Sequence, residues 1–248
     1  MLALVLGGCA TAGPTHVYWA AASGSTVHDL ETASGERRSL DNQTAKGEEI
    51  VGLAYDQFTD YLFLRLSPGD VLRIVNRPAG SRVRDLKLNS EVAVAPGETP
   101  VNSLDITVRS RNRHLFAIDP REPVIVEFTP AGEMVRKIKL ANPPRGPVGG
   151  IGFDDRRDRL VVLFAASPAV LAEITLDGVI VHQTNLAAAV HSISLGCDAE
   201  AGEYFVPLAD GAIGVFDREG HLLRQHQVPA GVAPAAIGAG PRAFLRVF

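Results

Sequence analysis

A glycine recurs along the chain every 42 to 52 residues, each time in a short turn between two runs of alternating apolar and polar residues. The five copies are Gly35, Gly80, Gly132, Gly178 and Gly220. Tight turns between antiparallel strands often need a backbone conformation that favours glycine. Alternation with a period of two is typical of strands that expose one face to solvent. The repeat therefore predicts a series of β-hairpins.

A second pair of apolar runs precedes each of the last four hairpins. In the first copy VGLAYD at 51–56 is followed by YLFLRL at 61–66, and the later copies begin at residues 104, 150 and 193. These runs are more continuously apolar than the hairpin runs, as expected for strands buried on both faces. Each unit thus contains four strands in about 40 to 50 residues, which is the period of a β-propeller blade.

We therefore predict an all-β chain that forms a β-propeller of five or six four-stranded blades, with five favoured by the length of 248 residues. One blade cannot bury both faces of its sheet, so the repeats form a single domain, assigned to residues 16–248. We expect the ring to be closed by strands from both termini: three from the N-terminal segment, and an inner and a second strand from the segment after residue 233. A five-bladed ring would then have one strand in surplus. A β-sandwich is the competing architecture, but it does not explain the repeated unit.

The order of motifs in each unit resembles the NHL, YWTD and SMP-30 (gluconolactonase-like) group of propellers, of the six-bladed type. The motifs are an inner strand such as GLAYD or GIGFDD, a second strand such as YLFLRL, and a hairpin such as TLDGV. The resemblance covers nearly everything after residue 16. It implies a fold rather than an activity, because this architecture hosts many unrelated functions.

The SMP-30-like members of this group hold a divalent cation at the central channel with a Glu, an Asn and an Asp from different blades. Glu49, Asn102 and Asp105 could imitate that set, and His191 is placed to reach the channel mouth. Oxygen ligands of this kind suit Ca²⁺ or another hard cation. The resemblance thus implies a metal-dependent hydrolase as an alternative function, although neither the spacing nor the local sequence of these residues matches a motif of the family.

The sequence contains no other recognisable catalytic motif. It has no G-x-S-x-G elbow, no H-E-x-x-H, no phosphate-binding P-loop and no dinucleotide-binding glycine pattern. We predict no catalytic residue and expect no cofactor, with the channel cation as the open alternative.

The N-terminal segment Leu6-Gly7-Gly8-Cys9 resembles the lipobox of bacterial lipoproteins. In that family the peptide before the cysteine is removed, and the cysteine carries the lipid that anchors the chain to a membrane. The resemblance implies that residues 1–15 are a signal segment and linker, that Cys9 is lipidated, and that the protein resides in the bacterial cell envelope. Only eight residues precede Cys9 and none is basic, so an ordinary N-terminal strand stays as the alternative.

The charge pattern limits the partners. The chain has 24 Lys and Arg against 28 Asp and Glu, a net charge of −4, which argues against nucleic acid as the main ligand. Two basic runs are expected on the same rim of the disc, in turns between inner and second strands. They contain Arg109, Arg111, Arg113, Arg156, Arg157 and Arg159. The runs could dock an acidic partner or an anionic lipid surface, or could simply be solvated turn residues.

These observations favour a non-enzymatic, membrane-anchored propeller of the cell envelope. We expect a monomer that binds an envelope protein or a small ligand. The alternatives are the metal-dependent hydrolase and a purely structural module within an envelope complex.

Overall fold

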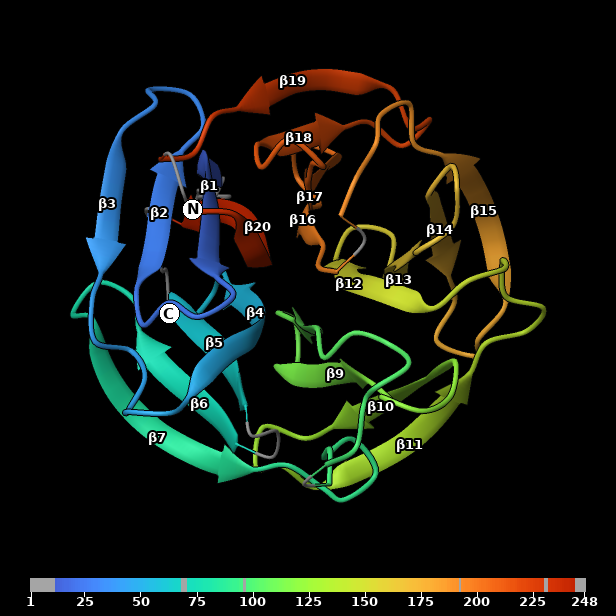
Figure 1. Cartoon of the computed structure of the whole chain (residues 1–248), viewed down its shortest axis with the longest axis horizontal. Helices are drawn as coiled ribbons and strands as arrows, with labels where there is room; N and C mark the ends of the chain where they lie inside the picture. Colours follow the sequence, from blue (N-terminus) through green and yellow to red (C-terminus); the bar gives the residue numbers. More distant parts are fainter. Residues whose placement is uncertain (1–11, 68–70, 96, 192, 230–231, 244–248) are drawn as a thin grey trace, which may run out of the picture.

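The computed structural model describes residues 12–67, 71–95, 97–191, 193–229 and 232–243. Within these ranges the chain forms twenty strands and no helix, arranged as five radial sheets in a ring (Figure 1). The described residues accordingly include no helix that is long and apolar enough to cross a membrane.

We number the blades along the chain and give the strands of each from the axis outwards. Blade 1 contains β20 (Pro234–Ala243), β1 (Ala12–Ala21), β2 (Val27–Glu31) and β3 (Arg37–Leu40). Blade 2 contains β4 (Glu49–Asp56), β5 (Tyr61–Ser67), β6 (Val71–Asn76) and β7 (Ser81–Lys87). Blade 3 contains β8 (Ile106–Arg109), β9 (His114–Ile118), β10 (Val124–Phe128) and β11 (Met134–Lys139). Blade 4 contains β12 (Val148–Asp154), β13 (Arg159–Phe164), β14 (Val170–Ile174) and β15 (Ile180–Asn185). Blade 5 contains β16 (Gly196–Asp198), β17 (Glu203–Pro207), β18 (Ile213–Phe216) and β19 (Leu222–His226).

The ring is closed by both termini, as the sequence predicts, and it has five blades rather than six. β20 pairs antiparallel with β1 from Thr15↔Pro241 to Ala20↔Ala236. The described C-terminal segment supplies one ten-residue strand, and the described residues of this blade form four strands; most of the expected second C-terminal strand lies in residues 244–248, outside the described residues. β1 begins at Ala12, which lies inside the segment assigned to the signal and linker.

The repeated glycines have the predicted role. All five have positive φ angles, between 61° and 88°, in the turn between the third and outer strands of their blades. A β-carbon on Gly178 would overlap the Lys139 carbonyl of blade 3. This position therefore needs a residue without a side chain, because the neighbouring blade is so close.

Burial follows the position of a strand in its blade. Every residue of the inner strand β12 is buried, whereas the outer strand β15 alternates between half-buried and exposed residues. The core lies between neighbouring sheets. Phe116 of blade 3, for example, stacks on Phe153 of blade 4 with ring centroids 5.4 Å apart. Blades are thus held mainly by apolar contact between flat sheet faces.

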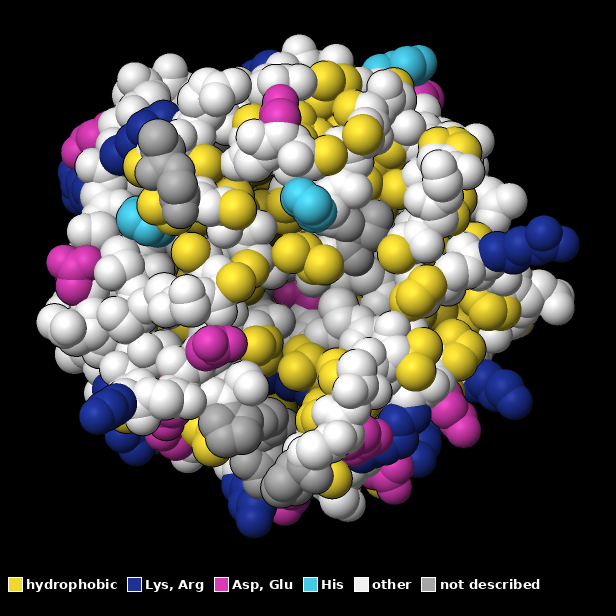
Figure 2. Space-filling model, in the orientation of Figure 1, with side chains coloured by type: hydrophobic (Ala, Val, Ile, Leu, Met, Phe, Trp, Pro, Cys, Tyr) yellow, Lys and Arg dark blue, Asp and Glu magenta, His cyan; other side chains and the backbone are white. Residues whose placement is uncertain are grey.

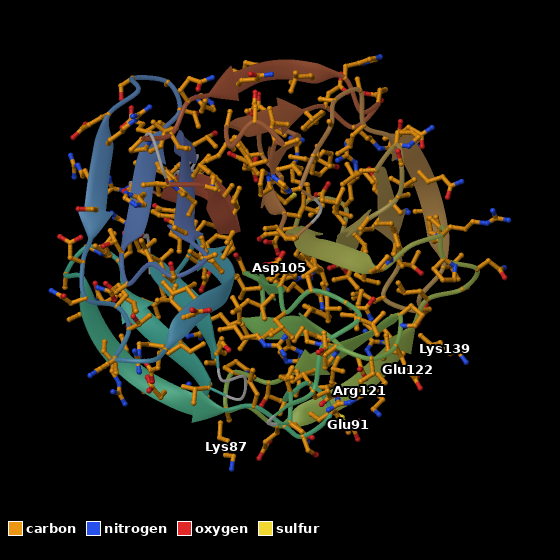
Figure 3. All side chains as sticks on the ribbon, in the orientation of Figure 1. Lys87, Glu91, Asp105, Arg121, Glu122 and Lys139 are labelled. Atoms are coloured by element: carbon orange, nitrogen blue, oxygen red, sulfur yellow. The ribbon has the colours of Figure 1, made fainter. Side chains whose placement is uncertain are left out.

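The two faces of the disc differ in how the chain enters and leaves the inner strands. All inner strands begin on one face, which we call the entry face, and end on the other, which we call the exit face. Figures 2 and 3 view the molecule from the entry face, with Asp105 labelled near the axis in Figure 3.

Candidate functional site

Asp105 closes the entry end of the axis. It is fully buried in the loop before β8, and its Oδ2 accepts hydrogen bonds from the backbone N–H groups of Ile151 and Leu195, each at 3.0 Å. Its Oδ1 accepts a hydrogen bond from Ser194 Oγ at 2.9 Å, and Ser194 Oγ in turn accepts one from the Ile237 N–H at 2.8 Å. One carboxylate therefore links blades 3, 4, 5 and 1.

Blade 2 joins this arrangement through a buried arginine. Arg65 of β5 is fully buried and donates hydrogen bonds to the carbonyl of Leu104, at 3.1 Å, and to that of Val92. Burial lowers the pKa of Arg65 to about 10, and the negative charge of Asp105 opposes that shift. Burial raises the pKa of Asp105 to about 7, while its three hydrogen bonds partly restore the charged form.

The channel set suggested by the SMP-30 resemblance is not brought together. Asn102 is buried, and its amide donates to the carbonyls of Asp119 and Glu122 and accepts from the Val148 N–H. Glu49 is exposed at the start of β4. The polar atoms of Asp105 and Asn102 are thus used within the protein rather than offered to a ligand.

His191 also lies apart from such a set. It is exposed in the loop before β16, and its backbone N–H donates to the Pro207 carbonyl. Across the residues that the structure describes, no group of three or more His, Cys, Asp or Glu side chains is arranged to hold a metal ion. The structure thus places Asp105 and Asn102 in buried hydrogen bonds between blades, and it leaves Glu49 and His191 exposed and apart from them. The buried polar groups face protein because adjacent blades approach each other closely near the axis: a β-carbon on Gly52 of blade 2 would lie 2.6 Å from the Leu104 carbonyl oxygen, in the loop before β8 of blade 3.

The exit end of the axis retains a small cavity of about 30 Å³, lined by residues from all five inner strands. That volume holds about two water molecules. The Asp155 carboxyl accepts a hydrogen bond from the Ser110 N–H at 3.3 Å through Oδ2, and its buried Oδ1 has no partner among the described residues. Burial raises the pKa of Asp155 to about 6, and the negative charge of Asp56 contributes.

Both basic runs lie on the exit face, in the adjacent blades 3 and 4, and two of the six arginines are in ion pairs. Arg109 pairs with Asp158 at 2.6 Å, and Arg157 pairs with Asp154 at 2.6 Å. Arg156 donates to the carbonyl of Glu200 at 3.3 Å. Within the described part of the chain, Arg111, Arg113 and Arg159 are recorded in no ion pair. The free positive charge is smaller than the sequence suggests.

The entry face is poor in charge over blades 4, 5 and 1. Six loops reach it there, at 22–26, 140–147, 165–169, 186–195, 208–212 and 227–233, and their only charged residues are Arg145 and Asp210. Among the described residues, the large exposed hydrophobic side chains of the entry face are Ile193, 42% exposed, in the loop before β16 of blade 5, and Val101, 64% exposed, in the loop before β8 of blade 3. Figure 2 shows hydrophobic side chains around the centre of the face and charged ones mainly at its rim. The rim charges near blade 3 include Glu91, which pairs with Lys137 at 2.6 Å, and Arg121, which pairs with Glu98 at 2.7 Å (Figure 3).

Two blades contain a buried histidine–carboxylate pair that the sequence analysis missed. In blade 1 His16 Nδ1 lies 2.6 Å from Asp29 Oδ1, and in blade 3 His114 Nδ1 lies 2.6 Å from Glu127 Oε1. In both blades the acid follows the histidine by 13 residues, and an arginine follows the acid by 9 residues. This shared spacing of His, acid and Arg, unrelated to the glycine repeat, is the signal that could have found them.

The two cysteines differ. Cys9 lies outside the described residues. Burial raises the pKa of the Cys197 thiol well above its usual value, so that thiol stays protonated at neutral pH. Tyr18 and Trp19 are buried core residues, whereas Phe58 is exposed on the exit face.

Comparison with known proteins identifies the fold and nothing more specific. No family model and no curated protein sequence matches the chain. A chain of the crystal structure of the nidogen/laminin complex superposes with a TM-score of 0.62 and 12% identity, over 91% of this chain and 98% of that one. A protein of unknown function from Bacteroides caccae gives a TM-score of 0.59 and 12% identity, over 92% of this chain and 99% of that one. What these chains share is the fold.

Proposed function

We propose that this chain is a non-enzymatic protein-binding propeller that docks its partner on the entry face. The observation that carries the proposal is the charge-poor surface of blades 4, 5 and 1 around a closed axis, with Ile193 exposed in it. Val101 is exposed on the same face, in the loop before β8 of blade 3. A contiguous exposed apolar surface marks a protein interaction site or a ligand-binding groove. The polar atoms of Asp105 and Asn102, the leading candidates for channel chemistry, are occupied by hydrogen bonds inside the protein. A chain with a similar fold occurs in the nidogen/laminin complex.

We further propose that the protein is a monomer in the bacterial cell envelope, anchored by a lipid on Cys9. β1 begins on the exit face, because its first residues pair with the last residues of β20. Cys9 precedes Ala12 by three residues, which span at most about 11 Å. A lipid on Cys9 would therefore hold the exit face towards the membrane and leave the entry face free for a partner.

Site-specific photo-crosslinking in the native cell tests the docking face. A photoreactive amino acid is placed at Val101 or Ile193 on the entry face and, as matched controls, at Glu133 or Asp177 on the exit face, which are also exposed. We expect both entry positions to give adducts with the same protein, identified by mass spectrometry, and the exit positions to give none. Adducts that are absent, or equally frequent from both faces, would refute the docking face.

The anchor is tested by labelling with radioactive palmitate. We expect the wild-type chain and a Cys197→Ala variant to incorporate label and to sediment with membranes, and a Cys9→Ser variant to do neither. Equal labelling of the wild type and Cys9→Ser would refute the anchor and would leave the docking face untouched.

A further inference from the structure

His16 has one ring nitrogen without a partner in the interior of the closing blade. The side chain lies on β1, and the residue is only 3% exposed. Asp29 holds Nδ1 at 2.6 Å, so the ring orientation is fixed and Nε2 points away from Asp29. Nε2 has no hydrogen-bond partner among the described residues, although an unpaired buried polar atom costs free energy.

A second carboxylate stands beside that nitrogen. Glu31 lies directly opposite His16 in the β1–β2 ladder, and its Oε2 is 3.8 Å from His16 Nε2. Both residues line a cavity of about 10 Å³, together with Asp29, Glu36 and Arg38. This volume suits about one water molecule or a single ion.

A metal ion could bridge the 3.8 Å between these two atoms. Zinc-type ions bind histidine nitrogen and carboxylate oxygen at about 2.0 to 2.2 Å, so an ion shared by the two atoms would subtend an angle of about 130°. A water molecule hydrogen-bonded to both at about 2.8 Å would subtend roughly 85°, which departs from the tetrahedral angle by a similar amount, so the choice of a metal rests on the chemistry of the ligands. A carboxylate on the far ring nitrogen is also the usual companion of a metal-binding histidine.

We propose that His16 Nε2 and the Glu31 carboxylate form a binding site for one divalent transition-metal ion of the zinc type, with Asp29 orienting the histidine. The nitrogen ligand disfavours Ca²⁺ and Mg²⁺, which prefer oxygen ligands alone. In the present side-chain positions, His16 and Glu31 are the two protein ligands at the cavity. Glu36 also lines the cavity and would become the third ligand. Its carboxylate is now paired with Arg38 at 2.7 Å, but both side chains are more than half exposed. A pair that exposed contributes about 0 to 1 kcal/mol, so the metal can recruit Glu36 at small cost.

Blade 3 provides an internal control. His114 and Glu127 repeat the geometry of His16 and Asp29, but the residue two positions after the acid is Thr129 in blade 3 and Glu31 in blade 1. The His114 side chain is also 24% exposed, so water can satisfy its second nitrogen. Blade 3 therefore has the orienting pair without the second ligand, and no such site is expected there.

The test uses the whole chain, without a histidine tag, and the ions Zn²⁺ and Co²⁺. We expect titration calorimetry to give one ion per chain, and bound Co²⁺ to show the visible absorption of a four- or five-coordinate site. Glu31→Gln should weaken binding at least tenfold, and His114→Gln should leave it unchanged. Arg38→Gln should tighten binding severalfold, because it frees Glu36 and removes a positive charge from the cavity.

The variants are chosen so that misfolding does not imitate loss of the site. Glu31 and Arg38 are partly exposed, and the thermal melts of their variants without metal should match that of the wild type. The proposal is overturned if the wild type binds no ion at unit stoichiometry, if Glu31→Gln binds like the wild type, or if His114→Gln abolishes binding. Because none of these measurements involves the entry face, their failure would not bear on the docking proposal.

Discussion

The two faces of the propeller hold neighbouring blades together by different means. On the entry face the links are hydrogen bonds in which backbone N–H groups of neighbouring blades donate to the buried side chains of Asp105 and Asn102. On the exit face they are contacts between side chains of adjacent blades, such as Arg218 with Glu173, Arg109 with Asp158, and Thr15 with Asp198. A carboxylate that binds backbone amides needs no exposed counter-charge nearby, whereas an ion pair between turns leaves charged groups at the surface.

The surface chemistry follows this difference. Each of the nine turns on the exit face carries at least one charged residue, while the six entry loops of blades 4, 5 and 1 carry two in total. Because the hub near the axis links the blades on the entry side, those loops do not need charged side chains for that purpose. They are rich in Ala, Pro, Val and Ser. The face with the buried hub is thus the one that can present an apolar surface to a partner.

Removing the hub should have the largest effect on stability. Asp105→Ala leaves the N–H groups of Ile151 and Leu195 and the Ser194 hydroxyl without their acceptor, and Arg65 without a nearby negative charge. We expect the free energy of unfolding to fall by about 3 to 5 kcal/mol. Urea denaturation followed by circular dichroism measures the change.

Asp105→Asn is the matched control for the hub. Its carbonyl can accept from both backbone N–H groups, and Ser194 Oγ can accept from its amide, so we expect a loss of about 1 to 2 kcal/mol. If the alanine and asparagine variants were equally stable, the hub would contribute through its volume alone and not through its hydrogen bonds.

Breaking an ion pair on the exit face should cost less. Glu173 is buried and depends on Arg218 of the next blade, so Arg218→Met should cost about 2 to 3 kcal/mol. Arg136→Met is the comparison, because Glu127 keeps His114 when Arg136 is lost, and we expect a cost of about 1 kcal/mol or less. Urea melts of both variants measure these costs. Equal losses would mean that the histidine does not substitute for the arginine.

The fold was predictable because its signals are local. The glycine at each hairpin depends on turn geometry, and the alternation of the outer strands depends on the exposure of one face to solvent. Both can be recognised in the sequence of one blade, whatever the arrangement of the ring. The predicted inner strand after residue 233 is found as β20, which runs through Gly238 and Gly240, whereas most of the predicted second strand lies outside the described residues.

The candidate site was less predictable because it depends on which blade faces which polar group. A polar residue at the start of an inner strand, such as Asp105, can point into an open channel or at the backbone of another blade. The sequence pattern of a blade is the same in both cases. The close approach of glycines such as Gly52 and Gly150 to neighbouring loops is what directs such a residue at the backbone of another blade and not into an open channel. The His16 pair was missed because only blades 1 and 3 share its spacing.

The exit-face cavity should make stability depend on pH through Asp155. Its pKa is raised to about 6 in the folded state from an ordinary value of 3.8, so the wild type loses stability as pH rises from about 4 to about 6. The Asp155→Asn side chain carries no charge at any pH, so the variant does not lose stability by ionising in the cavity. We expect the variant to match the wild type at pH 4 and to exceed it by about 1 to 2 kcal/mol at pH 8. Urea melts at the two pH values measure the difference, and a constant difference at both would contradict the raised pKa.

The smallest effect on stability is expected where the largest effect on binding is proposed. Val101 and Ile193 are exposed on the entry face and bury little area on folding, so Val101→Ser and Ile193→Ser should each change the free energy of unfolding by about 0.5 kcal/mol or less. Thermal melts measure this, with Val148→Ser on the buried strand β12 as a contrast that should lose several times more. A large loss in either surface variant would mean that these side chains serve the fold. Their exposure would then no longer support a docking surface, and the asymmetry between the two faces would be a by-product of how the loops pack.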